Sequence, residues 1–355
     1  KEQQEGNFYI NESTELVIKI AVYANEGDLE IEALRILNSD KVLAAKHNII
    51  PLVWSRKSFD NPYYTKKGGM ILREFPESWP DRAQEKMRNE KTIAALVVPN
   101  LETAGKMYEV REVYELHGPQ GLRRFMRSLL LTLDYAHGVG VNNYDLYHTN
   151  VFSDEKGNAV VADWNFMHAQ GQNVFEPEAN FAIVPPEAIL EEVPVPTDDA
   201  GGISMKQVKQ TSIGSHDVWS VGVMFANQLF QPCVWIRHSH FGDRGGDLRP
   251  YLREIVQSVG GNTKIRVNSD GDESDVGAVV GLDYNEIAQI SFKVPLCENH
   301  RGKCSPCKSD NFPVLSSFNE TKALAYDLLK RMMVLAPQDR PSPAELLKHP
   351  FFHNE

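Results

Sequence analysis

The 355-residue sequence contains few cysteines, no excess of basic residues and no long apolar run. A membrane-spanning helix needs about 18 consecutive apolar residues, so we expect no such helix. The formal net charge of −11 argues against a nucleic-acid partner, because nucleic acid is bound by basic surfaces. With 42% hydrophobic residues the chain can bury a sizeable core, and we expect a folded protein.

Three of the four cysteines lie close together near residue 300, with one histidine among them. The group consists of Cys297, His300, Cys304 and Cys307. Thiolates and an imidazole at such short spacing can converge on Zn²⁺, although structural zinc sites usually have two separated ligand pairs. A local disulfide and free thiols are the alternatives, and the sequence leaves all three open.

The first residues, KEQQEG, are polar and do not have the apolar core of a signal peptide. Asn11 and Asn319 begin glycosylation sequons, which matter only in a secreted chain. We therefore expect a cytoplasmic or nuclear protein by default. The sequons and the cysteine group keep secretion open as the alternative.

Strand-like segments come first along the chain, and helical segments follow. β-Branched residues predict strands at 15–23, 49–54 and 94–98. Apolar residues at helical spacing predict helices at 29–37, 122–137 and 217–230. The order predicts an α+β fold in which a small sheet with one helix precedes a mainly helical part.

Residues 143–165 concentrate the chemically useful side chains. Asp145 and Asn150 share one loop, and Asp163 follows a short turn-forming stretch. Phosphoryl transfer needs a group that orients the attacking hydroxyl and oxygen ligands that hold Mg²⁺ against the nucleotide phosphates. Taken alone, the same residues also suit a pair of turns, where Asp and Asn are common.

The flanking segments favour the chemical interpretation. YDLYHTN at 144–150 and DWN at 163–165 resemble the catalytic loop and the metal-binding D-F-G segment of protein kinases. Further segments resemble that family in the same order: VIK at 17–19, PPE at 185–187, DVWSVG at 217–222 and DRP at 339–341. The sequence thus resembles the eukaryotic protein kinase superfamily of the Ser/Thr type. LDYAH at 133–137 and Trp164 most resemble casein kinase II and its relatives.

The resemblance implies a two-lobed fold. Residues 1–101 would form the nucleotide-binding lobe, a small antiparallel sheet with one helix, interrupted by an insertion at 58–90. Residues 102–355 would form the larger, mainly helical lobe, with an insertion at about 258–318. The family's Gly-rich loop is not apparent, because residues 1–6 contain only Gly6. Either the N-terminal lobe is truncated or this loop has been lost.

The resemblance also implies ATP and Mg²⁺ as cofactors and a role for each site residue. Lys19 would pair with the ATP phosphates and be held by Glu30, with Glu32 as the alternative. Asp145 would orient the substrate hydroxyl or accept its proton. Asn150, a catalytic-loop residue, and Asp163 would hold Mg²⁺. For Lys19 alone, a solvated strand lysine is the other interpretation.

Four more roles follow from the same alignment. Val98 would be the gatekeeper, and residues 99–101, which end at Leu101, would be the hinge that receives adenine. Asp217 would accept hydrogen bonds from the catalytic-loop backbone. Glu187 and Arg340 would form a buried ion pair that fastens the substrate-side loop to the helical lobe.

Several residues depart from the family pattern. Tyr147 stands where Ser/Thr kinases have a lysine beside the transferring phosphoryl group, and its loss should slow the reaction. Asn143 and Tyr144 replace the His and Arg of the catalytic loop, and Asn165 replaces the glycine after the metal-binding Asp. The segment 166–186 contains no Ser, Thr or Tyr, so its own phosphorylation cannot regulate the protein.

Three functions remain open on the sequence. The first is a weak protein kinase that transfers phosphate from ATP to Ser or Thr of a protein substrate. The second is a pseudokinase that binds a protein partner or acts as a scaffold. The third, a small-molecule or lipid kinase, is disfavoured because 185–187 and the 217–230 helix resemble protein kinases. The sequence does not identify the substrate or the oligomeric state.

Overall fold

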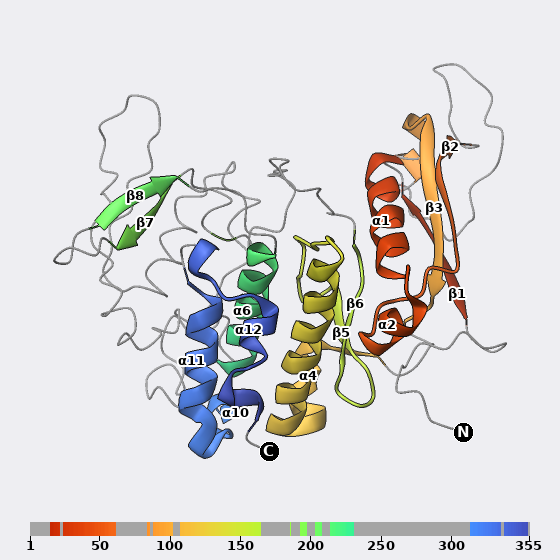
Figure 1. The fold of residues 1–355 in the computed structure, drawn as a ribbon. Coiled ribbons are helices and arrows are strands. Elements are labelled where there is room, and N and C mark those ends of the chain that lie inside the picture. Colours follow the sequence, from red (N-terminus) through yellow and green to blue (C-terminus); the bar gives the residue numbers. More distant parts are fainter. Residues whose placement is uncertain are drawn as a thin grey trace.

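The computed structural model describes residues 15–21, 24–61, 84–85, 88–101, 107–164, 185, 192–196, 203–207, 214–230, 313–334 and 337–353. In these residues a small sheet with one long helix forms one group, and a set of helices forms the other (Figure 1). The α+β class and the order of sheet before helices are as predicted. No helix in these ranges is long and apolar enough to span a membrane.

The first sheet is antiparallel and has the strand order β1-β3-β2. Its strands are β1 (Leu16–Ala21), β2 (Trp54–Asp60) and β3 (Thr92–Pro99). Lys19 pairs with Leu96, and Val17 with Val98. β3 is the central strand and carries a buried run from Ile93 to Leu96, which explains its continuous apolar sequence.

Helix α1 (Ala24–Leu37) packs across this sheet, as Figure 1 shows. Ile31, Leu34 and Leu37 form its buried face. The short helix α2 (Lys41–Lys46) follows and is capped by Asp40, whose carboxylate accepts hydrogen bonds from two backbone N–H groups.

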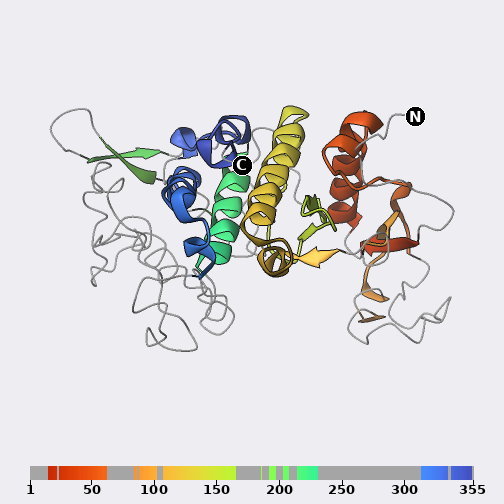
Figure 2. The ribbon, with the colours of Figure 1, turned by 90° about the horizontal axis from the view of Figure 1, so that it is seen from below.

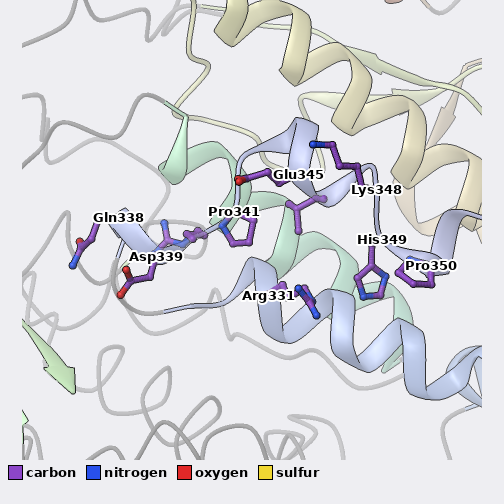
Figure 3. A pocket seen from close by; sticks show the side chains of 10 residues that line it. Arg331, Gln338, Asp339, Pro341, Glu345, Lys348, His349 and Pro350 are labelled. Carbon is purple, nitrogen blue, oxygen red and sulfur yellow. The ribbon is translucent and has the colours of Figure 1, made fainter. Parts of the chain in front are cut away.

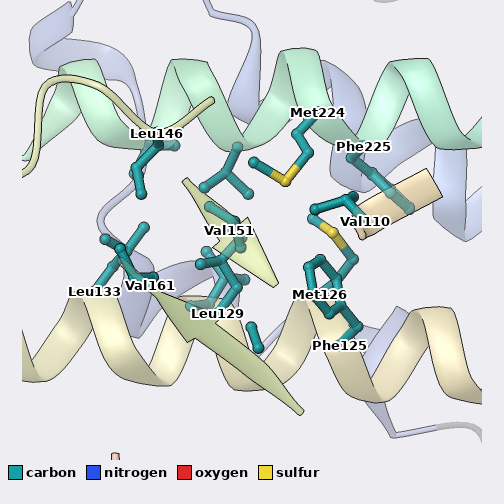
Figure 4. Close-up of a cluster of buried hydrophobic side chains, with 14 of the residues drawn as sticks. Val110, Phe125, Met126, Leu129, Leu133, Leu146, Val151, Val161, Met224 and Phe225 are labelled. Carbon is teal, nitrogen blue, oxygen red and sulfur yellow. The ribbon is translucent and has the colours of Figure 1, made fainter. Parts of the chain in front are cut away.

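The helical group is built on α4 (Val113–Gly138) and α6 (Ser215–Leu229). Figures 1 and 2 both place α4 between α6 and the sheet group. Gly118 breaks the regular backbone of α4 with φ 65°, a conformation that glycine adopts readily, and Pro119 follows it. Figure 4 shows the core between the two helices, where Phe125 and Leu129 of α4 face Met224 and Phe225 of α6.

The other described elements of this group are short, except for the 11-residue helix α11. They are η1 (Val110–Glu112), α10 (Pro313–Ser316), η2 (Asn319–Thr321), α11 (Lys322–Met332), η3 (Pro337–Asp339), α12 (Pro343–Leu346) and η4 (Pro350–Phe352). A separate antiparallel pair consists of β7 (Glu192–Pro196) and β8 (Ile203–Gln207). Helix α11 packs on α6, and α12 packs on α4.

A second small sheet holds the loops of interest. Its order is β4-β5-β6, with β4 (Tyr108–Glu109), β5 (Val151–Ser153) and β6 (Ala159–Val161). Asp154 closes the turn between β5 and β6 by accepting hydrogen bonds from the backbone N–H of Asn158 at 2.7 Å and of Lys156 at 2.9 Å. The hairpin therefore brings the loop before β5 next to the loop after β6.

One predicted strand, 49–54, is wrong. Ile49 makes only an isolated parallel bridge with Val161, and the strand itself begins at Trp54 and runs to Asp60. Pro51 has no backbone N–H for a ladder, which explains the late start. β2 therefore extends into the range that the sequence assigned to an insertion at 58–90.

Several predictions concern residues that the structure does not describe. These residues are Gly6, Asn11, Asn165, Glu187, Cys297, His300, Cys304 and Cys307, with most of the insertions at 58–90 and 258–318. Asn319 is described and lies exposed in η2.

Candidate active site

Lys19 connects the sheet, helix α1 and the loop after β6. Its Nζ lies 2.9 Å from Oε2 of Glu30, and it also contacts Oδ1 of Asp163, which is 144 positions away in the sequence. Glu30 is buried, and burial raises its pKa, while the ammonium of Lys19 opposes that shift. Burial disfavours the charge on Lys19, but Glu30 and Asp163 outweigh it and raise the pKa of Lys19.

The structure decides between the two carboxylates expected to hold Lys19. Glu30 points to Lys19, whereas Glu32 contacts Lys57 of β2. Residues two apart on a helix differ by about 200° in direction, so one helix cannot present both carboxylates to the same amine. Because two carboxylates contact the ammonium of Lys19, whose side chain is 37% exposed, the amine is paired and not only solvated.

Asp145 and Asn150 are joined within the loop before β5. The Asn150 amide donates to the Asp145 carboxylate at 2.8 Å and to its backbone carbonyl at 3.0 Å. Burial and then the charge of Asp163 raise the pKa of Asp145 to about 6, while the hydrogen bond from Asn150 opposes the shift. A carboxylate poised in this way is suited to accept a proton near neutral pH.

Asn143 joins the two loops and was not predicted to have this function. Its side chain is fully buried, and its amide donates to the backbone carbonyl of Asp163 at 3.0 Å. Its Oδ1 accepts the backbone N–H of Asp145 at 3.0 Å. Asp163 has φ 60°, a left-handed conformation that is uncommon for a residue other than glycine. The sequence showed Asn143 only as a departure from the family's histidine.

Asp217 accepts hydrogen bonds from the backbone of the loop before β5, as predicted. Its buried carboxylate accepts the backbone N–H groups of Asn143 at 2.9 Å and Tyr144 at 2.8 Å, and lies 2.8 Å from Nε2 of His137. Burial acts to raise the pKa of Asp217, but the bonds from His137 and the loop backbone outweigh it and lower that pKa. Because α6 carries this carboxylate, the core helix fixes the loop.

Val98 and Leu101 pack against a small apolar cluster. The cluster has Ile50 and Val160 at its centre and includes Met107, Phe152 and Ala162. The predicted gatekeeper, Val98, and the hinge residue Leu101 therefore pack against the same apolar cluster. The surface of such a cluster can stack against a flat heterocyclic ring.

Two tyrosines occupy positions at which the resemblance leads us to expect cations. The ring of Tyr147 is half-buried against the main core, with its centroid 3.9 Å from that of His148. The ring of Tyr144 meets His216 edge-on at 5.1 Å. Burial, and then the charge of Asp217, raise the pKa of Tyr144 to about 12, so its phenol stays neutral at physiological pH.

The expected magnesium ligands are one carboxylate, Asp163, and one amide, Asn150. Among the described residues, no group of three or more His, Cys, Asp or Glu is arranged to hold a metal ion. Mg²⁺ is commonly bound by one or two protein oxygens together with substrate phosphates and water. The two side chains therefore fit an ion that binds together with a nucleotide.

A pocket of about 420 Å³ lies elsewhere, among α11, η3 and α12 (Figure 3). Several of its charged groups already bond within the fold. Glu345 accepts bonds from Ser342, and Arg331 and His349 both contact Asp327. None of its lining residues belongs to the site around Lys19 and Asp145.

Comparison with protein families agrees with this geometry. A family model described as the protein kinase domain matches residues 87–352. The match includes Asp145, Asn150, Asp163 and the supporting helix α6, while Lys19 and Glu30 lie before it. It covers more than half of the sequence. The chain therefore belongs to the protein kinase family.

Proposed function

We propose that this protein transfers the γ-phosphoryl group of ATP, weakly, to Ser or Thr hydroxyls of a protein substrate. The observation that carries the proposal is the contact of Lys19 with both Glu30 and Asp163. Kinases need a lysine held by a helix glutamate beside a metal-binding aspartate. Here these groups come from three separate parts of the chain, and each is in contact with Lys19.

The proposed division of roles follows from the contacts. Lys19 binds the α and β phosphates, and Asp163 and Asn150 hold Mg²⁺, which would neutralise charge on the phosphates when bound. The adenine ring lies on the apolar surface of Val98 and Leu101. In this proposal residues 1–101 and 102–355 are the two lobes, and the nucleotide binds between them.

Asp145 is the proposed base. Its carboxylate orients the substrate hydroxyl and accepts the proton, since its raised pKa makes it a better acceptor than an ordinary aspartate. The Asn150 amide fixes the direction of that carboxylate from 2.8 Å. Positioning of this kind is a major part of catalysis in phosphoryl transfer.

Within the family, we propose a place near casein kinase II. This proposal depends on LDYAH at 133–137 and on Trp164, which is fully buried and donates from its indole N–H to the carbonyl of Val161 at 3.2 Å. His137 of the same motif supports Asp217.

Zinc binding or a disulfide at the cysteine group, and a cytoplasmic or nuclear location, stay predictions from the sequence.

A pseudokinase is the second candidate, and one observation favours it. Tyr147 brings a neutral phenol, half-buried against the core, where the family has a lysine. One lost preorganised donor costs about 10²–10³ in rate in other enzymes. In this case the same fold would bind a nucleotide or a protein partner without useful turnover.

A nucleotide-binding experiment tests the proposal. We expect ATP with Mg²⁺ to raise the melting temperature of the parent protein more than ATP alone, because the metal needs the phosphates to complete its ligands. Asp163→Asn should remove the magnesium-dependent part. Asp339→Asn, an exposed aspartate in η3, is the matched control and should behave as the parent.

Transfer of labelled phosphate to a generic protein substrate separates the two candidates. Activity that disappears in Asp145→Asn supports the kinase. Binding without activity supports the pseudokinase. Equal stabilisation with and without Mg²⁺ in the parent contradicts the metal role of Asp163.

A further inference from the structure

One flank of helix α1 is joined to the edge strand β2 by three polar contacts. The carboxylate of Asp28 accepts hydrogen bonds from the backbone N–H of Ser58, at 2.9 Å, and from its hydroxyl. Glu32 contacts the ammonium of Lys57. Arg35 donates from Nη2 to the hydroxyl of Ser55 at 3.1 Å. We name these three contacts the polar ladder.

The ladder follows from the geometry of both elements. Positions 28, 32 and 35 are spaced i, i+4 and i+7, which places them on one ridge of a helix. The partners run in the opposite direction along β2, from Ser58 to Ser55. The register of β2 shifts between Arg56 and Phe59, and such a bulge allows Lys57 and Ser58, which are consecutive, both to reach the helix.

The opposite flank of α1 carries Glu30, which holds Lys19. Positions 28 and 30 differ by about 200° around a helix, so the ladder and Glu30 lie on opposite sides of its axis. Between them the helix sits directly on the sheet at Gly27, where an added Cβ would come within 2.5 Å of the Cβ of Ala21 and 2.6 Å of that of Ala94. Any roll of α1 about this contact would move Glu30 relative to Lys19.

We infer that the polar ladder sets the rotation of α1 on the sheet and thereby holds Glu30 against Lys19. Asp28, Glu32 and Arg35 are then positioning residues for the proposed nucleotide site. The importance of the ladder for nucleotide binding rests on the proposed function. All of its contacts, and the Glu30 contact that it positions, lie within residues 19–58.

A charge-reversal series tests the ladder through the chemistry of Lys19 itself. The acylation rate of the Lys19 amine by acetic anhydride, followed by mass spectrometry, needs no nucleotide. Glu32→Lys places a lysine opposite Lys57, and the repulsion should roll α1 on the sheet. Glu30 should then move away from Lys19, and the Lys19 amine should react roughly threefold to tenfold faster. Adding Lys57→Glu restores an attractive pair and should return the rate to near that of the parent.

Two further variants complete the series, one as a control and one as a second disruption of the ladder. Glu155→Lys makes the same reversal at an exposed position in the turn between β5 and β6, and it should leave the Lys19 rate unchanged. Asp28→Ala weakens a different contact of the ladder and should also accelerate the acylation. Salt should reduce the difference between Glu32→Lys and the parent, because exposed charges are screened.

The affinity for ATP with Mg²⁺ is the second measurement. We expect it to fall by a similar factor in Glu32→Lys and to recover with Lys57→Glu. Equal acylation rates in all variants would overturn the inference. If the parent binds ATP and Glu32→Lys changes the acylation rate but not the affinity, the role of the ladder in nucleotide binding is overturned. If the parent binds no ATP, the proposed function fails, and the acylation series still decides whether the ladder positions Glu30.

Discussion

The side-chain amide of Asn143 donates a hydrogen bond to the backbone carbonyl of Asp163 at 3.0 Å. At its other end the same side chain accepts the backbone N–H of Asp145 at 3.0 Å. One buried amide therefore connects the residue proposed to accept the proton with the residue proposed to hold the metal. It also holds the carbonyl of Asp163, whose left-handed backbone needs support from its surroundings.

Replacing Asn143 should weaken the magnesium-dependent step. Asn143→Leu keeps the branched shape of the side chain but leaves two part-buried backbone groups, the carbonyl of Asp163 and the N–H of Asp145, without this partner. Leaving such a group unpaired costs up to about 1–3 kcal/mol where it is buried. We expect the magnesium requirement for ATP binding to rise about 10- to 100-fold, as for other residues that orient metal ligands. A Mg²⁺ titration of nucleotide binding measures this.

Asn143→His provides the comparison. An imidazole N–H can replace the donor to Asp163, so this variant should keep more of the magnesium response than Asn143→Leu. Binding of nucleotide without metal should change little in either variant. A leucine variant that binds Mg²⁺ and ATP as the parent does would show that Asn143 only fills space.

Arg340 should be important for stability. It is buried, donates to the carbonyls of Ser215 at 2.6 Å and Val334 at 3.0 Å, and stacks over Trp219. Arg340→Ala removes all of these contacts and should lower the free energy of unfolding by about 3–5 kcal/mol, because each of the two hydrogen bonds from the charged group contributes about 1.5–3 kcal/mol. Arg331→Ala, an exposed arginine paired with Asp327, is the control and should cost about 1 kcal/mol or less. Denaturant unfolding compares the two.

The expected partnership of Arg340 with Glu187 has its own test, because Glu187 lies outside the described residues. If the two form a buried pair, Glu187→Leu in the Arg340→Met background should recover part of the stability lost in Arg340→Met. Additive losses would mean that the two side chains do not interact. The stabilising effect of Arg340 would then come from its contacts with Ser215, Val334 and Trp219.

Tyr147→Lys should increase the turnover of a weak kinase. A lysine would add a positive charge where charge develops on the transferring phosphoryl group, and this favours the transition state over the bound substrate. The gain should be about tenfold or more if the charge alone is missing. Phosphate transfer to a generic protein substrate measures it.

Asp145→Asn controls the Tyr147 experiment. It should abolish transfer in the parent and in Tyr147→Lys. Transfer that survives this substitution would indicate a contaminating enzyme or different chemistry. If both Tyr147→Lys and the parent bind ATP but transfer nothing, the pseudokinase becomes the better description.

The amino-acid sequence by itself determined the class of fold and the identity of most candidate site residues. Hydrophobic periodicity is a local property, so it located α1, α4, α6 and the strands around Lys19 and Val97. It failed at 49–54, because Pro51 and the pairing partner decide where a strand begins. The order of the motifs indicated Asp145, Asn150, Asp163 and Asp217, since these motifs follow one another along this chain in the same order as in the family that it resembles.

Only the tertiary structure decided which of these groups meet. The choice of Glu30 over Glu32 depends on the rotation of α1 against two strands, and the spacing of charges along the chain does not contain that rotation. The role of Asn143 depends on two backbone groups, which carry no signal in side-chain identity. Contacts between residues as distant as Lys19 and Asp163 arise when the core packs, so they could not be derived from local sequence.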